Sequence, residues 1–347
     1  MKIKWGVIGC GGIALRRTIP GMMLSENSEL VAVMDTNFEA AEKVKEEFGA
    51  KYAFSSAEEL LNVEEIDEVY IATPVFCHKE QVKLAAEAKK HILLEKPMGL
   101  TVEESIEIDD ICKKNGVKLG VGLMMRFSSY HQKMKELISN GVIGDIVSMR
   151  GQFTCWYPEM PGVWRQDKKF SGGGALIDMG IHAIDLLQYI SSTKAKTIAC
   201  FSNNNVFKYS VDDSSALLMK MDNGATAFVD ANFNIPDNAA KCRLEFYGTK
   251  GSLLAEGTLG QVEDGTILLT TSDPDAAYDA QQNREDKAFE KVEITNTGNM
   301  YEKEISSFAN AIINDTAPEI TAEDGIFVQT IVEKAYLASQ EGVYKNI

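Results

Sequence analysis

The segment Ile3–Ala14 reads Ile-Lys-Trp-Gly-Val-Ile-Gly-Cys-Gly-Gly-Ile-Ala and decides the fold of the first third of the chain. An apolar, strand-like run leads into a glycine-rich turn with the spacing G-x-G-x-x-A. In this pattern Gly9 makes a tight turn, Gly11 lets the backbone approach a pyrophosphate, and the small Ala14 permits close helix–strand packing. A tight structural turn without a ligand is the alternative.

An acidic residue at the end of the second strand supports a dinucleotide site. Asp35 lies at the position, roughly 20 residues on, where this pattern expects an acid that accepts hydrogen bonds from ribose hydroxyls. Its charge would repel a 2′-phosphate, so NAD is expected and NADP is less favoured. The predicted cofactor-binding residues of this region are Gly9, Gly11, Gly12, Ile13 and Asp35.

The composition is that of an ordinary globular protein. Its 347 residues are about twice the length of a typical domain, so two domains are expected. The formal net charge of −16 repels phosphate backbones and anionic lipids, which argues against nucleic acid or a membrane as partner. No apolar run approaches the ~18–20 residues that cross a bilayer, and no signal-peptide pattern is visible. Six cysteines without a CxxC pair are typical of a reducing compartment, so we expect a cytoplasmic protein.

Hydrophobic patterning changes near Gly122. Before it, short apolar runs alternate with helical patterns, as in βαβ units around a parallel sheet. After it, strand-like stretches dominate, and Asn223-Gly224 predicts a hairpin whose two turn residues both have positive φ. Asp273–Lys287 is polar and poorly periodic, which indicates a surface loop. We expect an α/β protein, with a Rossmann dinucleotide-binding domain over 1–122 and an α+β domain with a large, mostly antiparallel open sheet over 123–347.

A lysine follows one of the buried strands of the first domain. Glu95-Lys96-Pro97 comes directly after the strand His91–Leu94, and ligands of open α/β sheets bind beyond the carboxyl ends of the strands. The ammonium group of Lys96 can polarise a substrate oxygen or shift the pKa of a neighbouring base. We expect Lys96 in the crevice, with Glu95 and Lys96 also near the cofactor. A surface lysine is the alternative.

A second cluster, Gly172–Asp185, begins with three glycines, which indicates a backbone that approaches a ligand or another chain closely. In the helical pattern that follows, Asp178, His182 and Asp185 share one face, opposite an apolar one. His182 suits an acid or base for an alcohol proton, and Asp178 could position the substrate or tune the imidazole. A solvated helix face is the alternative. No metal is expected, because two ligands without a third are thin support for one.

Weaker candidates surround these clusters. Thr73-Pro74 ends a parallel strand, where it could touch a nicotinamide, and His78 suits a helix cap or a residue behind the site. Arg126 could place a guanidinium at the cleft between the domains. A strand stop and a salt-bridged surface arginine are the alternatives. His131, beside polar residues on a helix, is expected at the surface.

Aromatic side chains with polar donors precede the second cluster. Such a combination suits a sugar ring, so Tyr157, Trp164 and Arg165 are candidate substrate-binding residues. An aromatic core with an exposed arginine is the alternative.

Together these motifs resemble the glucose–fructose oxidoreductase/inositol dehydrogenase/MocA (Gfo/Idh/MocA) family over nearly the whole chain. They are Trp5–Gly11, Ala72-Thr73-Pro74 with His78, Glu95-Lys96-Pro97 and Gly172–Asp185. Val75 stands where the family often has asparagine, and valine cannot make the hydrogen bond of an amide.

The resemblance implies the parts of an active site. Nicotinamide dinucleotide would bind at the glycine turn and at Thr73, Pro74 and His78. The catalytic residues would be Lys96, Asp178 and His182, and the second domain would bind substrate and form a homodimer or homotetramer through its open sheet.

The resulting hypothesis is a reversible, NAD-dependent oxidation of a secondary hydroxyl on a sugar, glycoside or cyclic polyol, with C3 of a glycoside as the preferred position. His182 would take the hydroxyl proton, Lys96 would stabilise the alkoxide, and Asp178 would orient the substrate or His182. Two alternatives stay open: a glycosidase that oxidises C3 transiently with NAD, and a nucleotide-binding regulator without catalysis.

Overall fold

The computed structural model describes residues 2–261, 263–272, 289–295 and 297–347. Within these residues no helix is both long and apolar enough to cross a membrane. The six cysteines are free thiols. The chain divides into two compact units, each built from segments far apart in sequence. The first unit comprises Met1–Phe127, Gly162–Gly172 and Gly298–Thr330, and the second comprises Ser128–Pro161, Gly173–Thr297 and Ile331–Ile347.

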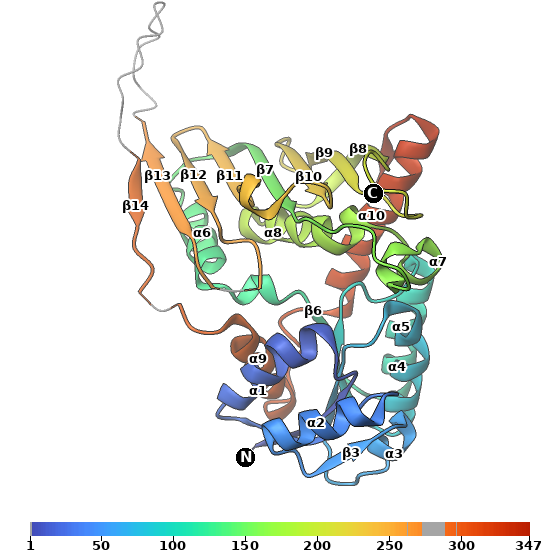
Figure 1. The fold of residues 1–347 in the computed structure, drawn as a ribbon. Helices are drawn as coiled ribbons and strands as arrows, with labels where there is room; N and C mark the ends of the chain where they lie inside the picture. The colour runs from blue at the N-terminus through green and yellow to red at the C-terminus, as the bar shows by residue number, and fades with distance from the viewer. Residues whose placement is uncertain (1, 262, 273–288, 296) are drawn as a thin grey trace, which may run out of the picture. The chain divides into compact units, whose positions relative to one another are not determined.

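A parallel sheet of six strands forms the centre of the first unit (Figure 1). Its order is β3-β2-β1-β4-β5-β6, which is that of a doubly wound dinucleotide-binding fold. In such sheets, ligands bind at the carboxyl ends where the strand order reverses, here between β1 and β4. The predicted Rossmann fold is confirmed. The strands are β1 (Ile3–Ile8), β2 (Ser28–Met34), β3 (Tyr52–Phe54), β4 (Glu68–Ile71), β5 (His91–Glu95) and β6 (Leu119–Gly122).

A helix from near the C-terminus completes the core of this unit. α9 (Met300–Ile313) packs against α1 (Ile19–Leu24) and contributes buried Phe308, whose ring centroid lies 6.0 Å from that of Trp5. α4 packs against α5 and α3 (Figure 1). The other helices here are α2 (Phe38–Phe48), α3 (Ala57–Leu61), α4 (His78–Glu87), α5 (Val102–Asn115), α7 (Lys168–Ser171), the first part of α10 (Ala322–Glu341), the π-helix η1 (Ala14–Thr18) and the 3-10 turns η2 (Val75–Cys77), η3 (Met124–Phe127) and η4 (Trp164–Gln166).

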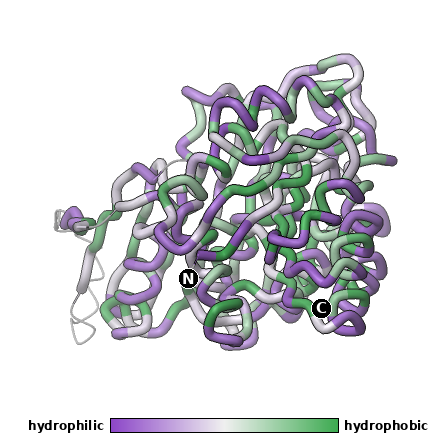
Figure 2. Tube along the Cα trace, turned by 90° about the horizontal axis from the view of Figure 1, so that it is seen from below, coloured by the Kyte–Doolittle hydropathy of each residue, from purple (hydrophilic) through white to green (hydrophobic). Residues whose placement is uncertain are grey.

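Capping residues begin and end these helices where the sequence indicates. Thr101 accepts a hydrogen bond from the backbone N–H of Glu104 at the start of α5, and Gly116 closes the same helix with φ +70°. Gly49 ends α2 in the same way. Figure 2 shows hydrophobic and hydrophilic residues interspersed along the chain.

The second unit is built on a nine-stranded sheet of order β14-β13-β12-β11-β7-β10-β9-β8-β15. All its pairs are antiparallel except β7 with β10, so the predicted, mostly antiparallel sheet is confirmed. α6 (Ser129–Ser139) and α8 (Ile181–Ser191) lie along one face (Figure 1). The strands are β7 (Ile146–Thr154), β8 (Ala195–Asn203), β9 (Ser214–Met221), β10 (Thr226–Asn232), β11 (Arg243–Gly248), β12 (Gly251–Glu256), β13 (Thr266–Thr271), β14 (Glu290–Val292) and β15 (Lys345–Asn346), with the π-helix η5 (Leu176–Gly180) and the 3-10 turn η6 (Asp237–Ala239).

The predicted hairpin joins β9 to β10, but its turn differs from the prediction. Only Gly224 has positive φ, at +90°, whereas Asn223 does not. The backbone N–H of Gly224 bonds to the carbonyl of Met221, and Met221 N–H bonds to Ala225. The turn is therefore longer than two residues and needs one left-handed position, which glycine fills. The predicted surface loop Asp273–Lys287 lies outside the described residues.

Candidate active site

The glycine turn follows β1 and places open space next to the backbone. A Cβ atom on Gly9, which has φ +100°, would lie 2.9 Å from the carbonyl oxygen of Ala72, so only glycine fits there. At Gly11 and Gly12 no atom lies within 4 Å of the corresponding position. Helical residues then run from Gly12 to Leu24, with a π-helical stretch in the middle. The turn thus leaves room for a phosphate at the start of a helix, as a dinucleotide needs.

The carboxylate of Asp35 lies beside this turn. Its Oδ2 atom accepts a hydrogen bond of 3.0 Å from the backbone N–H of Cys10, and its Oδ1 atom accepts one of 2.9 Å from Asn37. Each oxygen keeps a further acceptor position. Ile13 is half-buried at the helix start, and Ala14 is fully buried in the core, as close packing requires. The structure therefore fits a ribose at Asp35, and cofactor contact by these residues stays a prediction.

His78 connects two turns at the carboxyl edge of the sheet. Its Nε2 atom lies 3.0 Å from the carbonyl oxygen of Thr73, and its Nδ1 atom lies 3.1 Å from that of Pro97. The ring is 1% exposed, and this burial lowers its pKa despite the carbonyl partners, which act in the opposite direction. His78 thus holds Thr73-Pro74 against the turn that carries Lys96. The Lys96–Pro97 bond is cis.

Glu95, which precedes Lys96, ends β5 in a buried polar chain. Its Oε1 atom accepts a 2.5 Å hydrogen bond from the hydroxyl of Tyr70, which in turn accepts one of 3.0 Å from Thr18. The other oxygen accepts a bond of 3.2 Å from the backbone N–H of Lys96. Burial raises the pKa of Glu95, although these partners favour its charged form. The hydrogen bond to Lys96 N–H fixes the backbone from which the lysine side chain starts.

A second buried carboxyl lies near the first. Glu304 on α9 is 2% exposed, and burial, followed by the charge of Glu95, raises its pKa well above the usual value. Burial and the repulsion between two nearby carboxylates both disfavour the charged form, so each of these carboxyls keeps its proton to a higher pH than an exposed glutamate does.

Trp164 and Arg165 join an aromatic group in the first unit. The ring centroid of Trp164 lies 6.4 Å from that of Phe76, which follows Pro74 directly, and Phe170 lies 5.0 Å from Phe76. The guanidinium of Arg165 stacks 4.4 Å from the Trp164 ring, and its charge lowers the pKa of Glu95. These rings and the arginine therefore gather near the residues that follow β4 and end β5. Substrate contact by Trp164 and Arg165 stays a prediction.

Arg126 is buried and makes an ion pair of 3.3 Å with Asp324 in the same unit. Burial works to raise the pKa of Asp324, but Arg126 and the hydrogen bonds from Thr321 hold it below its usual value. The pairing matches the structural alternative, except that the arginine is not at the surface. Substrate contact by Arg126 stays a prediction.

The second unit carries Asp178 and His182 on one continuous helical segment. Asp178 lies in η5 and is half-buried, whereas His182 in α8 is 4% exposed. The His182 ring lies 6.2 Å from that of Phe153 in an edge-on arrangement. Burial and the charge of Asp178 raise the pKa of Cys155 to about 12, which places that thiol near Asp178. A π-helical turn at Asp178 is a feature that recurs at functional sites.

Asp185 is 1% exposed, so the alternative of a solvated helix face does not hold for this residue. The expectation that His131 lies at the surface was wrong. His131 is fully buried, with Nε2 3.3 Å from the hydroxyl of Thr258, because α6 packs on the sheet and not into solvent. Added Cβ atoms at Gly173 and Gly174 would meet Tyr336 and Asp212 of the same unit, so packing within this unit accounts for these two glycines. Approach of this backbone to a ligand or another chain stays a prediction.

Tyr157 packs in an aromatic cluster of the second unit. Its ring centroid lies 4.9 Å from that of Phe233, and its carbonyl oxygen accepts a 3.3 Å hydrogen bond from the hydroxyl of Tyr209. The side chain is half-buried. Its role toward a substrate stays a prediction.

Several residues around the site were missed from sequence. Tyr70 is a hydroxyl-bearing residue in a buried parallel strand, and Glu304 occupies the apolar face of its helix one turn before Phe308. Both are polar residues at core positions, a signal that predicts a partner or a function. Asp212 precedes a strand as half of an Asp-Asp pair, a signal too weak to indicate its contacts.

Comparison with known proteins identifies the family. Residues 3–123 match the model described as "Oxidoreductase family, NAD-binding Rossmann fold", and residues 131–254 match that of the GFO/IDH/MocA C-terminal domain. The chain belongs to the Gfo/Idh/MocA oxidoreductase family.

Known proteins of similar sequence match either most of the chain or a part of it. It is 28% identical over 326 residues to 1,5-anhydro-D-fructose reductase of Ensifer adhaerens, covering 93% of this chain and 92% of the relative. It is 36% identical over 210 residues to glucose-6-phosphate 3-dehydrogenase of Bacillus subtilis, covering 58% of each. The solved structure of a levoglucosan dehydrogenase with NADH and levoglucosan has the same fold, with a TM-score of 0.88, 23% identity and 100% coverage of both chains.

Proposed function

We propose that this protein oxidises a secondary hydroxyl of a sugar, glycoside or cyclic polyol reversibly to a ketone, with NAD as the hydride acceptor. The observation that carries the proposal is the open space over Gly11 and Gly12 beside the carboxylate of Asp35, which fits a dinucleotide. The same chain carries Lys96, Asp178 and His182, the proton-transfer set expected for this family. Names of relatives that act on sugars support the substrate class.

The chain's own residues move the proton and hold the oxygen. When bound, the nicotinamide supplies the hydride acceptor. His182 takes the hydroxyl proton as the carbon–hydrogen bond breaks, the ammonium of Lys96 stabilises the negative charge on the oxygen, and Asp178 orients the substrate or His182. The hydroxyl proton and the carbon-bound hydride leave, and a ketone forms.

Preference for NAD rests on Asp35. Its carboxylate, beside the glycine turn, would accept hydrogen bonds from the ribose hydroxyls and repel the 2′-phosphate of NADP. We propose C3 of a glycoside as the position that is oxidised, since one relative is named a 3-dehydrogenase. Six free thiols and the acidic charge fit a cytoplasmic setting.

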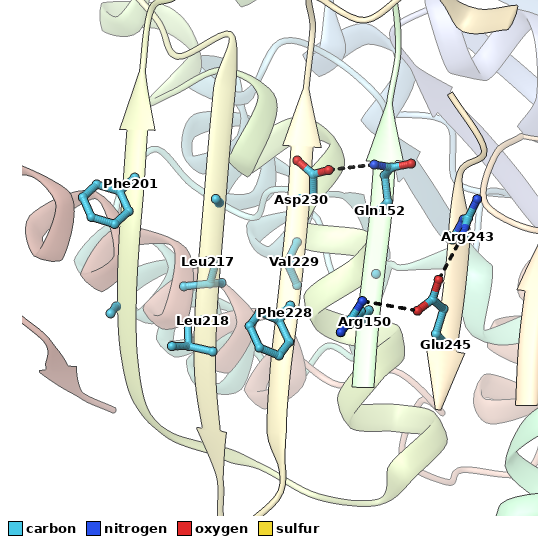
Figure 3. A pocket seen from close by; sticks show the side chains of 13 residues that line it. Arg150, Gln152, Phe201, Leu217, Leu218, Phe228, Val229, Asp230, Arg243 and Glu245 are labelled. Atoms are coloured by element: carbon cyan, nitrogen blue, oxygen red, sulfur yellow. Dashed lines mark hydrogen bonds and ion pairs between the residues drawn. The ribbon is translucent and has the colours of Figure 1, made fainter. Parts of the chain in front are cut away.

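We also propose that the open face of the nine-stranded sheet joins copies of this chain. α6 and α8 cover the other face, whereas this one holds a hollow of about 600 Å³ (Figure 3). One end of the hollow is apolar, with Phe201 76% exposed and Leu218 and Phe228 each 41% exposed. The other end is polar, where Glu245 pairs with Arg150 and Arg243. Exposed aromatic rings on a flat sheet are typical of a protein–protein interface.

The first test is nicotinamide absorbance with NAD and, in parallel, NADP on a panel of sugars, simple glycosides and inositols. NADH formation with one group of ring substrates is the expected result. Free aglycone without a change in absorbance would instead indicate the glycosidase, and nucleotide binding without turnover on any substrate would indicate the regulator.

A further inference from the structure

Asp212 lies beneath the start of the helical segment that carries Asp178 and His182. Its Oδ1 atom accepts a hydrogen bond of 2.7 Å from the backbone N–H of Gly174, and its Oδ2 atom accepts one of 2.9 Å from Leu176. The backbone carbonyl of Asp212 accepts a third, of 3.0 Å, from Ala175. Asp212, which is 9% exposed, therefore binds the three successive backbone N–H groups of Gly174, Ala175 and Leu176.

Tyr336 on α10 completes this arrangement. Its hydroxyl donates a 2.8 Å hydrogen bond to Oδ1 of Asp212. Hydrogen bonds from the backbone of Gly174 and Ile177 to the Tyr336 hydroxyl favour its charged form, although burial and the charge of Asp212 raise the Tyr336 pKa overall. Ser215 donates a 2.9 Å bond to Oδ2 of Asp212. Asp212 thus has partners in three segments of the second unit.

The neighbouring glycines show that contact with this pair is tight. An added Cβ at Gly173 would lie 2.2 Å from the hydroxyl oxygen of Tyr336, and one at Gly174 would lie 2.0 Å from the carbonyl oxygen of Asp212. No side chain larger than hydrogen fits there without moving the backbone. The glycines therefore serve to seat the helix start on Asp212 and Tyr336.

Asp213, next to Asp212, holds a different part of the backbone. Asp213 is fully buried and accepts backbone hydrogen bonds from Asn205, Val206 and Phe207 at 2.7–2.8 Å. It holds the loop after β8, not the helix start. Two buried aspartates of the same strand edge thus anchor two different backbones, and Asp213 offers a matched control for Asp212.

We propose that Asp212 and Tyr336 form a clamp that positions η5 and α8, and through them Asp178 and His182, for proton transfer. The clamp fixes the backbone two residues before Asp178 and six before His182 through charge-assisted hydrogen bonds, which are stronger than neutral ones. Because a displacement of about 1 Å can lower a rate about 100-fold, loss of the clamp should reach the reaction without removing a group that touches substrate. This role rests on the proposed function of Asp178 and His182.

The experiment compares Asp212→Asn and Tyr336→Phe with the control Asp213→Asn in the full-length protein. Hydrogen–deuterium exchange of the free protein measures directly how firmly the clamp holds the backbone of this segment. We expect Asp212→Asn and Tyr336→Phe to raise exchange at residues 174–182 by at least about tenfold, and Asp213→Asn to raise it at 204–209 instead. Wild-type exchange at 174–182 in Tyr336→Phe, which keeps the packing of the ring, would overturn the clamp even if Asp212→Asn fails to fold.

Steady-state kinetics with the ring substrate found in the absorbance panel measure the effect of losing the clamp on the reaction. We expect kcat to fall at least about tenfold in Asp212→Asn, with the dissociation constant of NAD unchanged, and to fall less than threefold in Asp213→Asn. The double variant Asp212→Asn/Tyr336→Phe should lose no more kcat than Asp212→Asn alone, because the side chains of Asp212 and Tyr336 act through the same helix start. Equal losses of kcat in Asp212→Asn and Asp213→Asn would overturn the positioning role.

The two proposals fail separately. If the wild-type protein turns over no member of the panel, the proposed function fails, while the exchange result still decides whether the clamp holds the segment. If turnover is present and exchange at 174–182 does not change in the variants, the clamp fails and the proposed function stands.

Discussion

The hydroxyl of Tyr70 donates a 2.5 Å hydrogen bond to the carboxylate of Glu95, the residue that precedes Lys96. Both side chains are buried, and the other carboxylate oxygen accepts the backbone N–H of Lys96. Polar contacts, in addition to packing, therefore hold the end of β5 in the core of the first unit. Glu304 belongs to this buried group, because burial and then the charge of Glu95 raise its pKa.

Tyr70→Phe removes one of the donors that hold Glu95. We expect the free energy of unfolding to fall by about 1–3 kcal/mol, because a buried carboxyl loses a partner and gains none. Urea denaturation at pH 7 measures the loss. A variant as stable as the wild type would show that the bond contributes nothing to the fold.

Glu304→Gln tests the buried carboxyl pair through pH. The folded protein holds a proton on Glu304 at pH values where the unfolded chain has released it, so stability falls as pH rises above the usual glutamate value. The slope reaches at most about 1.4 kcal/mol per pH unit for one proton. We expect Glu304→Gln to flatten the fall that begins as pH rises above the usual glutamate value. Glu302→Gln on the same helix is the control, and an identical slope in both variants would contradict the assignment.

Asp35→Ser tests the choice of cofactor. Removal of the carboxylate ends its repulsion of a 2′-phosphate, so the ratio of NADP to NAD affinity should rise at least about tenfold. Asp67→Ser removes the same charge at the amino edge of the sheet, where Asp67 accepts the N–H of Lys4, and should leave the ratio unchanged. Fluorescence titration of the wild type and both variants with each nucleotide gives the dissociation constants from which the ratios are formed. A ratio unmoved by Asp35→Ser would assign the preference elsewhere.

Gly11→Val separates a ligand role from a folding role. Nothing lies within 4 Å of an added Cβ at Gly11, so the melting temperature should stay within a few degrees of wild type while NAD affinity falls at least about tenfold. Gly174→Ala should do the reverse and destabilise the fold, since its Cβ would meet the carbonyl of Asp212. Normal NAD binding by a folded Gly11→Val protein would remove the glycine turn from the cofactor site.

The open sheet face is tested by charge. Phe201→Asp combined with Phe228→Asp places two carboxylates in the hollow of Figure 3, and we expect dimers or tetramers to dissociate to monomers in sedimentation experiments. Met23→Asp, at an exposed apolar residue of the first unit, should leave the assembly intact. An unchanged sedimentation coefficient in the double variant would exclude this face as the interface.

Local signals predicted much of this structure. The strand, glycine turn and acidic residue of the first unit are close in sequence, and each follows from backbone geometry that only certain residues allow. Thr101 at the start of α5, and Gly116 and Gly49 at the ends of α5 and α2, are likewise residue types that helix ends favour.

Contacts between distant segments could not be predicted. The burial of His131 depends on Thr258, and the glycines at 173 and 174 are explained by Tyr336 and Asp212, which a single sequence does not place beside them. The contribution of α9 to the first core also escaped, because an apolar helix face does not name the sheet it covers. The sequence predicts which residues carry chemistry, and tertiary contacts show what holds those residues in place.

The central claim is that His182 transfers the proton of a substrate hydroxyl bound by a protein that uses NAD. The most direct measurement is NADH formation by His182→Ala with the ring substrate found for the wild type, alongside a titration of NAD binding. We expect kcat to fall at least about a thousandfold, with NAD affinity within threefold of wild type. Turnover at the wild-type rate in His182→Ala would contradict it.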